Sequence, residues 1–162
     1  MPSQAARARA LARGPGFLGF LLAHHWPGSL DRCYRFWLGG RPVWICARCL
    51  GLYPVLLVGL VVCLVVRPPI GWWDAAWLFL LPAPAVVDWS RSRLATRAGS
   101  NPVRTATGVL LGASPARTVE LNMIQPGHGL VVAQLGALLL VALGVEGIAR
   151  WRAARGPTAD GG

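Results

Sequence analysis

The sequence predicts an all-α integral membrane helical bundle with about four membrane-spanning segments and a cysteine-containing loop at the membrane surface. Hydrophobic residues make up 54% of the 162 residues and charged residues only 14%, whereas soluble domains carry about 25% charged residues. The apolar residues are grouped in long blocks, which favours membrane spans over one soluble core. The formal net charge is +10, and the arginines flank these blocks, as is typical of membrane proteins.

A membrane domain with a segment on either side accounts for the whole chain. Residues 1–23 are basic with a short apolar stretch, and we expect an interfacial or partly inserted helix there rather than a cleaved signal peptide. Residues 24–150 form the membrane domain, which begins with a cysteine loop at 24–48. Residues 151–162 form a polar C-terminal tail that we expect to be disordered.

Four apolar segments are predicted to cross the membrane, at residues 49–66, 70–88, 105–121 and 129–149. A short proline-containing link makes the first two an antiparallel helical hairpin, and Pro82 and Pro84 should kink the second. The third is shorter than a standard span, and a full crossing would require Arg117 to extend to the far interface. The alternative is three spans plus an interfacial helix. Gly108 and Gly112 have the spacing that lets helices approach closely.

The arginines also predict the orientation of the spans. Four arginines precede the first span, only Arg67 follows it, and four more follow the second. Cytoplasmic loops carry an excess of basic residues, so we expect both termini in the cytoplasm. The basic flanks favour a bilayer with anionic headgroups as the partner. They do not form a basic face interleaved with aromatics, so we expect no nucleic-acid partner, and no protein partner is indicated.

A candidate metal site lies in the cysteine loop. Cys46 and Cys49 form a Cys-x-x-Cys pair at the start of the first span, and a third cysteine and two adjacent histidines precede them. Zn²⁺ takes four tetrahedral ligands from Cys and His, and metal binding can fold a loop that has little core. We therefore expect a structural zinc held by the three cysteines and one histidine. The candidate ligands are Cys33, Cys46, Cys49, His24 and His25.

The same cysteine pair also supports a redox interpretation. Cys46 and Cys49 stand at the N-terminus of a helix, where the dipole favours anions, and Arg48 adds positive charge. Thiolates serve metal binding and disulfide exchange alike, so a membrane thiol–disulfide oxidoreductase is the alternative. A cytoplasmic loop favours metal, because stable disulfides are rare in that compartment. Cys63 lies inside an apolar run and is interpreted as a small hydrophobic residue.

A small transporter or channel subunit is the third function class. Asp88, Glu120 and Arg104 flank or enter apolar segments, where ionisable residues often mark ion paths. We favour the structural interpretation, in which Asp88 pairs with Arg91 or Arg104. Nucleotide-binding, metalloprotease and serine-hydrolase motifs do not occur, which favours a non-enzymatic role over an enzyme.

Three blocks occur in order along the chain: CYRFWLGGRPVWICARCLGLY, PAVVDW and SNPVRTATGVLLG. Together they resemble the bacterial membrane proteins of domain-of-unknown-function family 2085. That family usually carries His directly after the first cysteine, where this chain has Tyr34, so His24 or His25 would have to substitute. The resemblance implies a small multi-pass protein of the bacterial inner or cytoplasmic membrane, and it implies no activity. The other candidate functional residues are Arg48, Asp88, Asn101, Arg104, Thr107 and Gly108.

Overall fold

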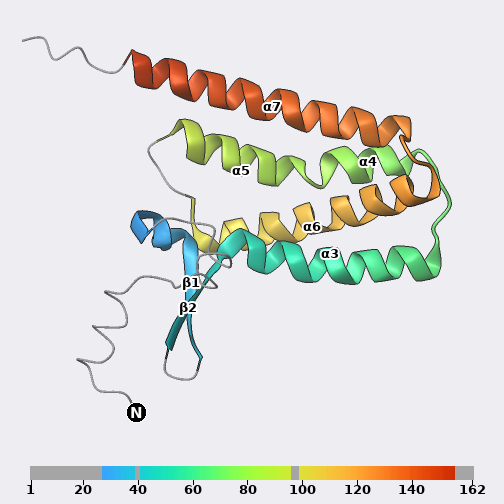
Figure 1. The fold of residues 1–162 in the computed structure, drawn as a ribbon, viewed down its shortest axis with the longest axis horizontal. Coiled ribbons are helices and arrows are strands. Elements are labelled where there is room, and N and C mark those ends of the chain that lie inside the picture. The colour runs from blue at the N-terminus through green and yellow to red at the C-terminus, as the bar shows by residue number, and fades with distance from the viewer. Residues whose placement is uncertain (1–26, 39–40, 96–98, 156–162) are drawn as a thin grey trace, which may run out of the picture.

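The computed structural model describes residues 27–38, 41–95 and 99–155, which are mostly helical (Figure 1). The segment 1–23, both candidate histidines and the end of the tail therefore lie outside the described residues. In chain order the elements are η1 (Pro27–Arg32), β1 (Cys33–Leu38), β2 (Arg41–Cys46), α3 (Ala47–Val66), α4 (Trp73–Leu80), α5 (Ala83–Leu94), α6 (Asn101–Ile124) and α7 (Gly129–Ala154).

Among the described residues, two helices are long and apolar enough to cross a membrane, α3 and α7. They coincide with the predicted spans 49–66 and 129–149. With 20 and 26 residues they extend about 30 and 39 Å, against a hydrocarbon core of about 30 Å. Their leucines and valines are widely exposed, for example Leu57 and Leu139. An apolar surface of this extent is typical of helices that face lipid.

The second predicted span, 70–88, is divided between two helices. α4 ends at Leu80 and α5 begins at Ala83, with Pro82 between them, so the predicted proline kink is a break between two helices. α5 then continues past the predicted end of this span at residue 88, as far as Leu94. Within the bundle α5 packs against both α6 and α7.

The third and fourth predicted segments are longer than expected. α6 has 24 residues, which extend about 36 Å, but it is less apolar than α3 and α7 and is not one of the two helices that are long and apolar enough to cross a membrane. The expectation of a short helix at 105–121 was therefore wrong in length. α7 continues through Ala154, into the segment that we assigned to the tail.

α3 and α6 lie side by side and run in the same direction (Figure 1). An added Cβ at Gly51, Gly108 or Gly112 would lie 2.3, 2.3 or 2.4 Å from a carbonyl oxygen of the other helix. Only glycine permits this approach, which confirms the close packing expected of the glycine pair in α6. The expected hairpin of the first two spans is corrected: the link does reverse the chain, but α3 packs mainly on α6 rather than on α4 and α5.

A β-hairpin occupies most of the segment that we expected to be an irregular loop. β1 and β2 pair antiparallel, with Cys33 opposite Cys46 at the base and Leu38 opposite Arg41 at the far end. The hairpin projects from the N-terminal end of α3 (Figure 1). Two six-residue runs rich in aromatic and branched residues, separated by two glycines, are a hairpin signal. The purely α-helical prediction missed it.

The far end of the bundle holds a buried cluster of three charges. Arg117 Nε donates to Asp74 Oδ1 at 2.7 Å, and Arg117 Nη1 donates to Glu120 Oε2 at 2.5 Å. All three side chains are at most 2% exposed. Arg117 therefore does not extend to the interface as we expected, because two carboxylates and the carbonyls of Pro68 and Pro69 hold it inside the protein.

Arg117→Gln should lower the free energy of unfolding by about 3–5 kcal/mol, because two buried carboxylates would lose their counter-charge. Arg150→Gln is the matched control, since Arg150 is 79% exposed in its pair with Glu146 and should contribute less than about 1 kcal/mol. Unfolding of both variants in detergent micelles, followed by circular dichroism, measures the difference. Equal, small losses in the two variants would contradict a buried ionic cluster.

Candidate functional site

The fold brings the three predicted cysteine ligands together at the base of the hairpin. The strand register places Cys33 opposite Cys46, and Cys46 is also the N-cap of α3. Cys49 follows one helical turn later and packs against the other two, together with Leu30 and Trp44. No disulfide joins these described cysteines. Their proximity thus follows from one strand pairing and one helix turn.

The three thiols pack together, but they are not arranged as the ligands of a metal ion would be. Within 27–38, 41–95 and 99–155, no group of three or more His, Cys, Asp or Glu side chains is arranged to hold a metal ion. The predicted fourth ligands, His24 and His25, are not among the described residues. The zinc site therefore remains a prediction, with three of its ligands packed in one cluster.

Burial sets the protonation of the first cysteine. Burial, together with the neighbouring Cys46 and Asp31, raises the pKa of Cys33 from 9.0 to about 11, while Arg104 acts in the opposite direction. Cys33 is therefore a protonated thiol at neutral pH. A metal ion binding there would have to displace this proton.

Arg48 of the Cys-Ala-Arg-Cys block joins α3 to α5. Its Nη2 forms an ion pair with Asp88 Oδ2. The expected partners of Asp88 were Arg91 and Arg104, and this expectation was wrong: Arg91 is exposed, and Asp88 reaches the N-terminal end of α3 instead. Asp88 therefore forms an ion pair, as the structural interpretation expects, but with a different arginine.

Asn101 and Gly108, at the start of α6, hold the hairpin base and α3 in place. Asn101 Nδ2 donates to the carbonyl oxygen of Asp31 at 3.0 Å. Gly108 lies directly against the carbonyl of Arg48. Thr107, another predicted residue of this block, donates to the carbonyl oxygen of Arg104 in the same helix at 3.2 Å and does not link α6 to another element.

Thr105, which the sequence did not single out, ties three elements together. Its hydroxyl donates to the carbonyl of Ala47 at 3.0 Å, at the start of α3. It also lies 3.4 Å from the hydroxyl of Tyr34 on β1. Tyr34, which stands where the resembled family carries His, thus contacts α6 and takes part in attaching the hairpin.

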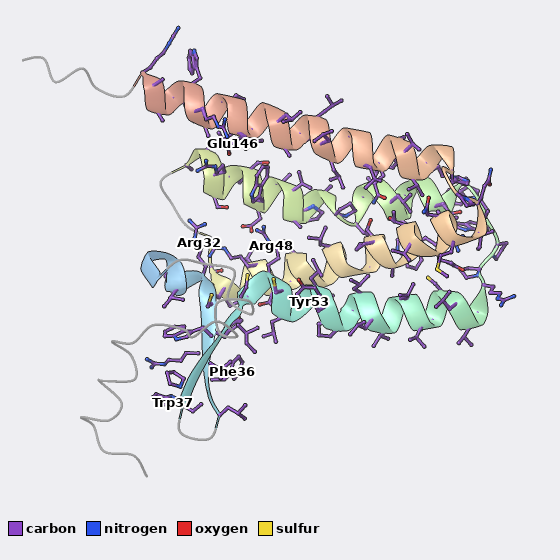
Figure 2. All side chains as sticks on the ribbon, viewed as in Figure 1. Arg32, Phe36, Trp37, Arg48, Tyr53 and Glu146 are labelled. Atoms are coloured by element: carbon purple, nitrogen blue, oxygen red, sulfur yellow. The ribbon has the colours of Figure 1, made fainter. Side chains whose placement is uncertain are left out.

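A pocket of about 350 Å³ lies beside the thiols, where η1, α3, α5 and α6 meet. Arg104 is only 4% exposed, and its Nη1 and Nη2 find no hydrogen-bond partner among the described residues. Arg48 Nε is also buried without a hydrogen-bond partner among the described residues. Figure 2 shows Arg32 and Arg48 close to one another at this end of the bundle. The pocket is lined by Arg32, Cys46, Arg48, Cys49, Leu52, Trp89, Ser92 and Arg104.

The residues proposed for an ion path are not brought together. Arg104 and Glu120 are separated by 16 positions of one helix, or about 24 Å. Asp88 lies at the Arg104 end, paired with Arg48, whereas Glu120 pairs with Arg117 at the other end. The geometry gives the transporter interpretation no support.

Sequence reasoning missed two parts of this arrangement. Arg32 directly precedes Cys33 and lines the pocket, a role that the hairpin register would have indicated. Asp74 belongs to the buried charge cluster, and the i, i+3 spacing of Arg117 and Glu120 was the available signal.

Comparison with known proteins places the chain in a family. A family model described as "Predicted membrane protein (DUF2085)" matches residues 31–116. The matched segment begins just before the first cysteine and ends within α6, so it contains the thiol cluster, Asp88 and the arginine pocket. No curated protein and no solved structure matches the chain. The chain therefore belongs to domain-of-unknown-function family 2085, a family of predicted membrane proteins.

Proposed function

We propose that this membrane protein binds a zinc ion on Cys33, Cys46 and Cys49, and that the ion fixes the hairpin to the end of the bundle. The packing of the three sulfur-bearing side chains in one cluster is the observation that carries the proposal. The role is binding and assembly rather than catalysis. His24 or His25 would supply the fourth ligand, since Zn²⁺ is tetrahedral in structural sites.

The low stability of an isolated hairpin is the reason for proposing a structural ion at its base. A two-stranded hairpin is marginally stable in water on its own, and Asn101 and Thr105 hold its base to α6 through the carbonyl of Cys33 and the hydroxyl of Tyr34. A zinc ion would link both strand ends to the first turn of α3 and would supply folding free energy directly. The hairpin would then present Phe36 and Trp37, which lie away from the helices (Figure 2) and are 44% and 41% exposed.

We further propose four membrane crossings, with α4 and α5 together forming the second and α6 the third. The starts of α3 and α6 and the ends of α5 and α7 lie at the same end of the bundle (Figure 1). Arginines gather at that end, and Arg67 lies at the other. By the positive-inside rule the hairpin end faces the cytoplasm, in the bacterial inner or cytoplasmic membrane.

Zinc content tests the proposed site directly. Protein purified in detergent without added metal should carry about one zinc per chain, and Cys33→Ser, Cys46→Ser and Cys49→Ser should each lose it. Cys63→Ser is the matched control, because Cys63 lies near the other end of the same helix and is buried. Mass spectrometry of metals and quantitative amino-acid analysis give the stoichiometry.

Two outcomes contradict the zinc proposal. Zinc that persists in the three cluster variants would locate the ion elsewhere. A metal-free protein that forms a reversible disulfide between Cys46 and Cys49 would support the membrane thiol–disulfide oxidoreductase instead. Peptide mapping after alkylation, with and without reductant, identifies that disulfide.

The raised pKa of Cys33 predicts the pH dependence of zinc binding. Zinc binds the thiolate, so the proton of Cys33 must leave, and below its pKa of about 11 the thiolate fraction grows tenfold per pH unit. The apparent zinc affinity should therefore rise at least about tenfold per unit between about pH 6 and pH 8. Competition with a chelator of known proton and zinc affinities measures this slope. An affinity that is flat or falls as pH rises would exclude a bond from zinc to Cys33.

A further inference from the structure

Arg104 is buried without a counter-charge of its own. It is 4% exposed, and neither of its terminal guanidinium nitrogens has a hydrogen-bond partner among the described residues. An unpaired guanidinium is costly to bury, and native structures rarely leave all of its donors unused. The nearest comparison within this chain is Arg117, which is equally buried and donates to two carboxylates and two carbonyls. Burial of Arg104 costs a similar free energy, but its terminal nitrogens have no such partners among the described residues.

Arg32 and Arg48 line the same pocket as Arg104. Asp88 engages Nη2 of Arg48 but leaves its Nε without a partner in the described chain. Three arginines therefore line a pocket of about 350 Å³, and the carboxylate of Asp88 pairs with one of them. The charge of this pocket is positive and its free hydrogen-bonding groups are donors, which is the chemistry of an anion site.

The helix directions reinforce this charge. α3 begins at Ala47 and α6 begins at Asn101, and both N-termini lie at this end of the bundle (Figure 1). Arg48 and Arg104 each lie in the first turn of their helix. Aligned peptide dipoles give each N-terminus a partial positive charge, and two parallel neighbours repel each other through it. An anion bound between the two ends would offset that repulsion.

We propose that this arginine pocket binds a phosphate group, carried by a phospholipid headgroup or present as free phosphate. Guanidinium forks from η1, α3 and α6 approach from three elements, which suits a tetrahedral anion of more than one charge better than a planar carboxylate. The pocket lies at the arginine-rich end, where membrane phosphates would be found if α3 and α7 cross the bilayer. The site is built from guanidinium groups, so it does not depend on the proposed zinc.

Two binding measurements on the chelator-treated full chain distinguish the two sources of phosphate. In the first, isothermal titration with inorganic phosphate in detergent measures free phosphate. In the second, phospholipid phosphorus is counted per chain after reconstitution in phosphatidylglycerol–phosphatidylcholine nanodiscs, re-extraction and detergent washing. We expect the wild type to bind in at least one measurement. Arg104→Gln should weaken that binding at least about tenfold, as expected for loss of a charge-assisted hydrogen-bond pair.

Arg91→Gln is the matched control, because Arg91 is exposed on α5 and is not a lining residue of the pocket. It removes the same charge and should change phosphate binding less than about twofold. Titration without lipid retention identifies free phosphate, and lipid retention without titration identifies the headgroup. Wild-type protein that binds in neither measurement overturns the proposal, and so does an equal loss in Arg91→Gln and Arg104→Gln.

Thermal melting separates binding from a structural role. In phosphate-free detergent, Arg104→Gln should melt no lower than the wild type, because the terminal guanidinium nitrogens Nη1 and Nη2 of Arg104 have no hydrogen-bond partner in the described chain. Phosphate or phosphatidylglycerol should raise the melting temperature of the wild type more than that of Arg104→Gln. Arg32→Gln is a second variant on a different element, and it should also reduce binding. A lower melting temperature of Arg104→Gln, with unchanged binding in Arg32→Gln, would assign Arg104 to the fold and overturn the site.

Discussion

The parallel contact of α3 with α6 is the constraint on which the rest of the structure depends. Gly51, Gly108 and Gly112 let the two backbones touch, which sets the first turn of α3 level with the second turn of α6. That level fixes the hairpin, because β2 continues directly into α3 while Asn101 holds the end of η1. It also places Arg104 beside Cys46 and Cys49 in one pocket. The Cys-Ala-Arg-Cys block and the start of α6, which α4 and α5 separate in the sequence, thus line one pocket.

The placement of apolar and polar side chains in this protein is the one that a bilayer requires. The outer faces of α3 and α7 expose leucine and valine, while many of the buried polar side chains bond to one another or to backbone carbonyls. Gln134 illustrates this, since it donates to the carbonyl of Leu78 and to Ser114 and so joins α7 to α4 and α6. Each buried charge in the ionic cluster at one end has a partner, whereas Arg104 at the other end has none in the described chain. That asymmetry distinguishes the end that holds the ionic cluster from the end where we propose the phosphate site.

The sequence predicted what depends on local composition and missed what depends on distant partners. Apolar length was sufficient for α3 and α7, and Pro82 was sufficient for the break before α5. The cysteine spacing correctly suggested that the three thiols belong together. By contrast, nothing local indicates that Asp88 meets Arg48, 40 positions earlier. The length of α6 was underestimated because Arg117 looks unfavourable in a helix until its carboxylate partners on neighbouring elements are known.

Disulfide trapping between α3 and α6 tests the central claim, which is their parallel contact. A Cβ built at Gly59 would lie 3.0 Å from Cβ of Ala116, and disulfides form where Cβ atoms are within about 4.5 Å. In a Cys63→Ser background, Gly59→Cys with Ala116→Cys should give a disulfide-linked peptide pair by mass spectrometry after mild oxidation in membranes. Gly59→Cys with Leu135→Cys on the exposed face of α7 is the control. Equal trapping in both pairs, or none between 59 and 116, would contradict the account.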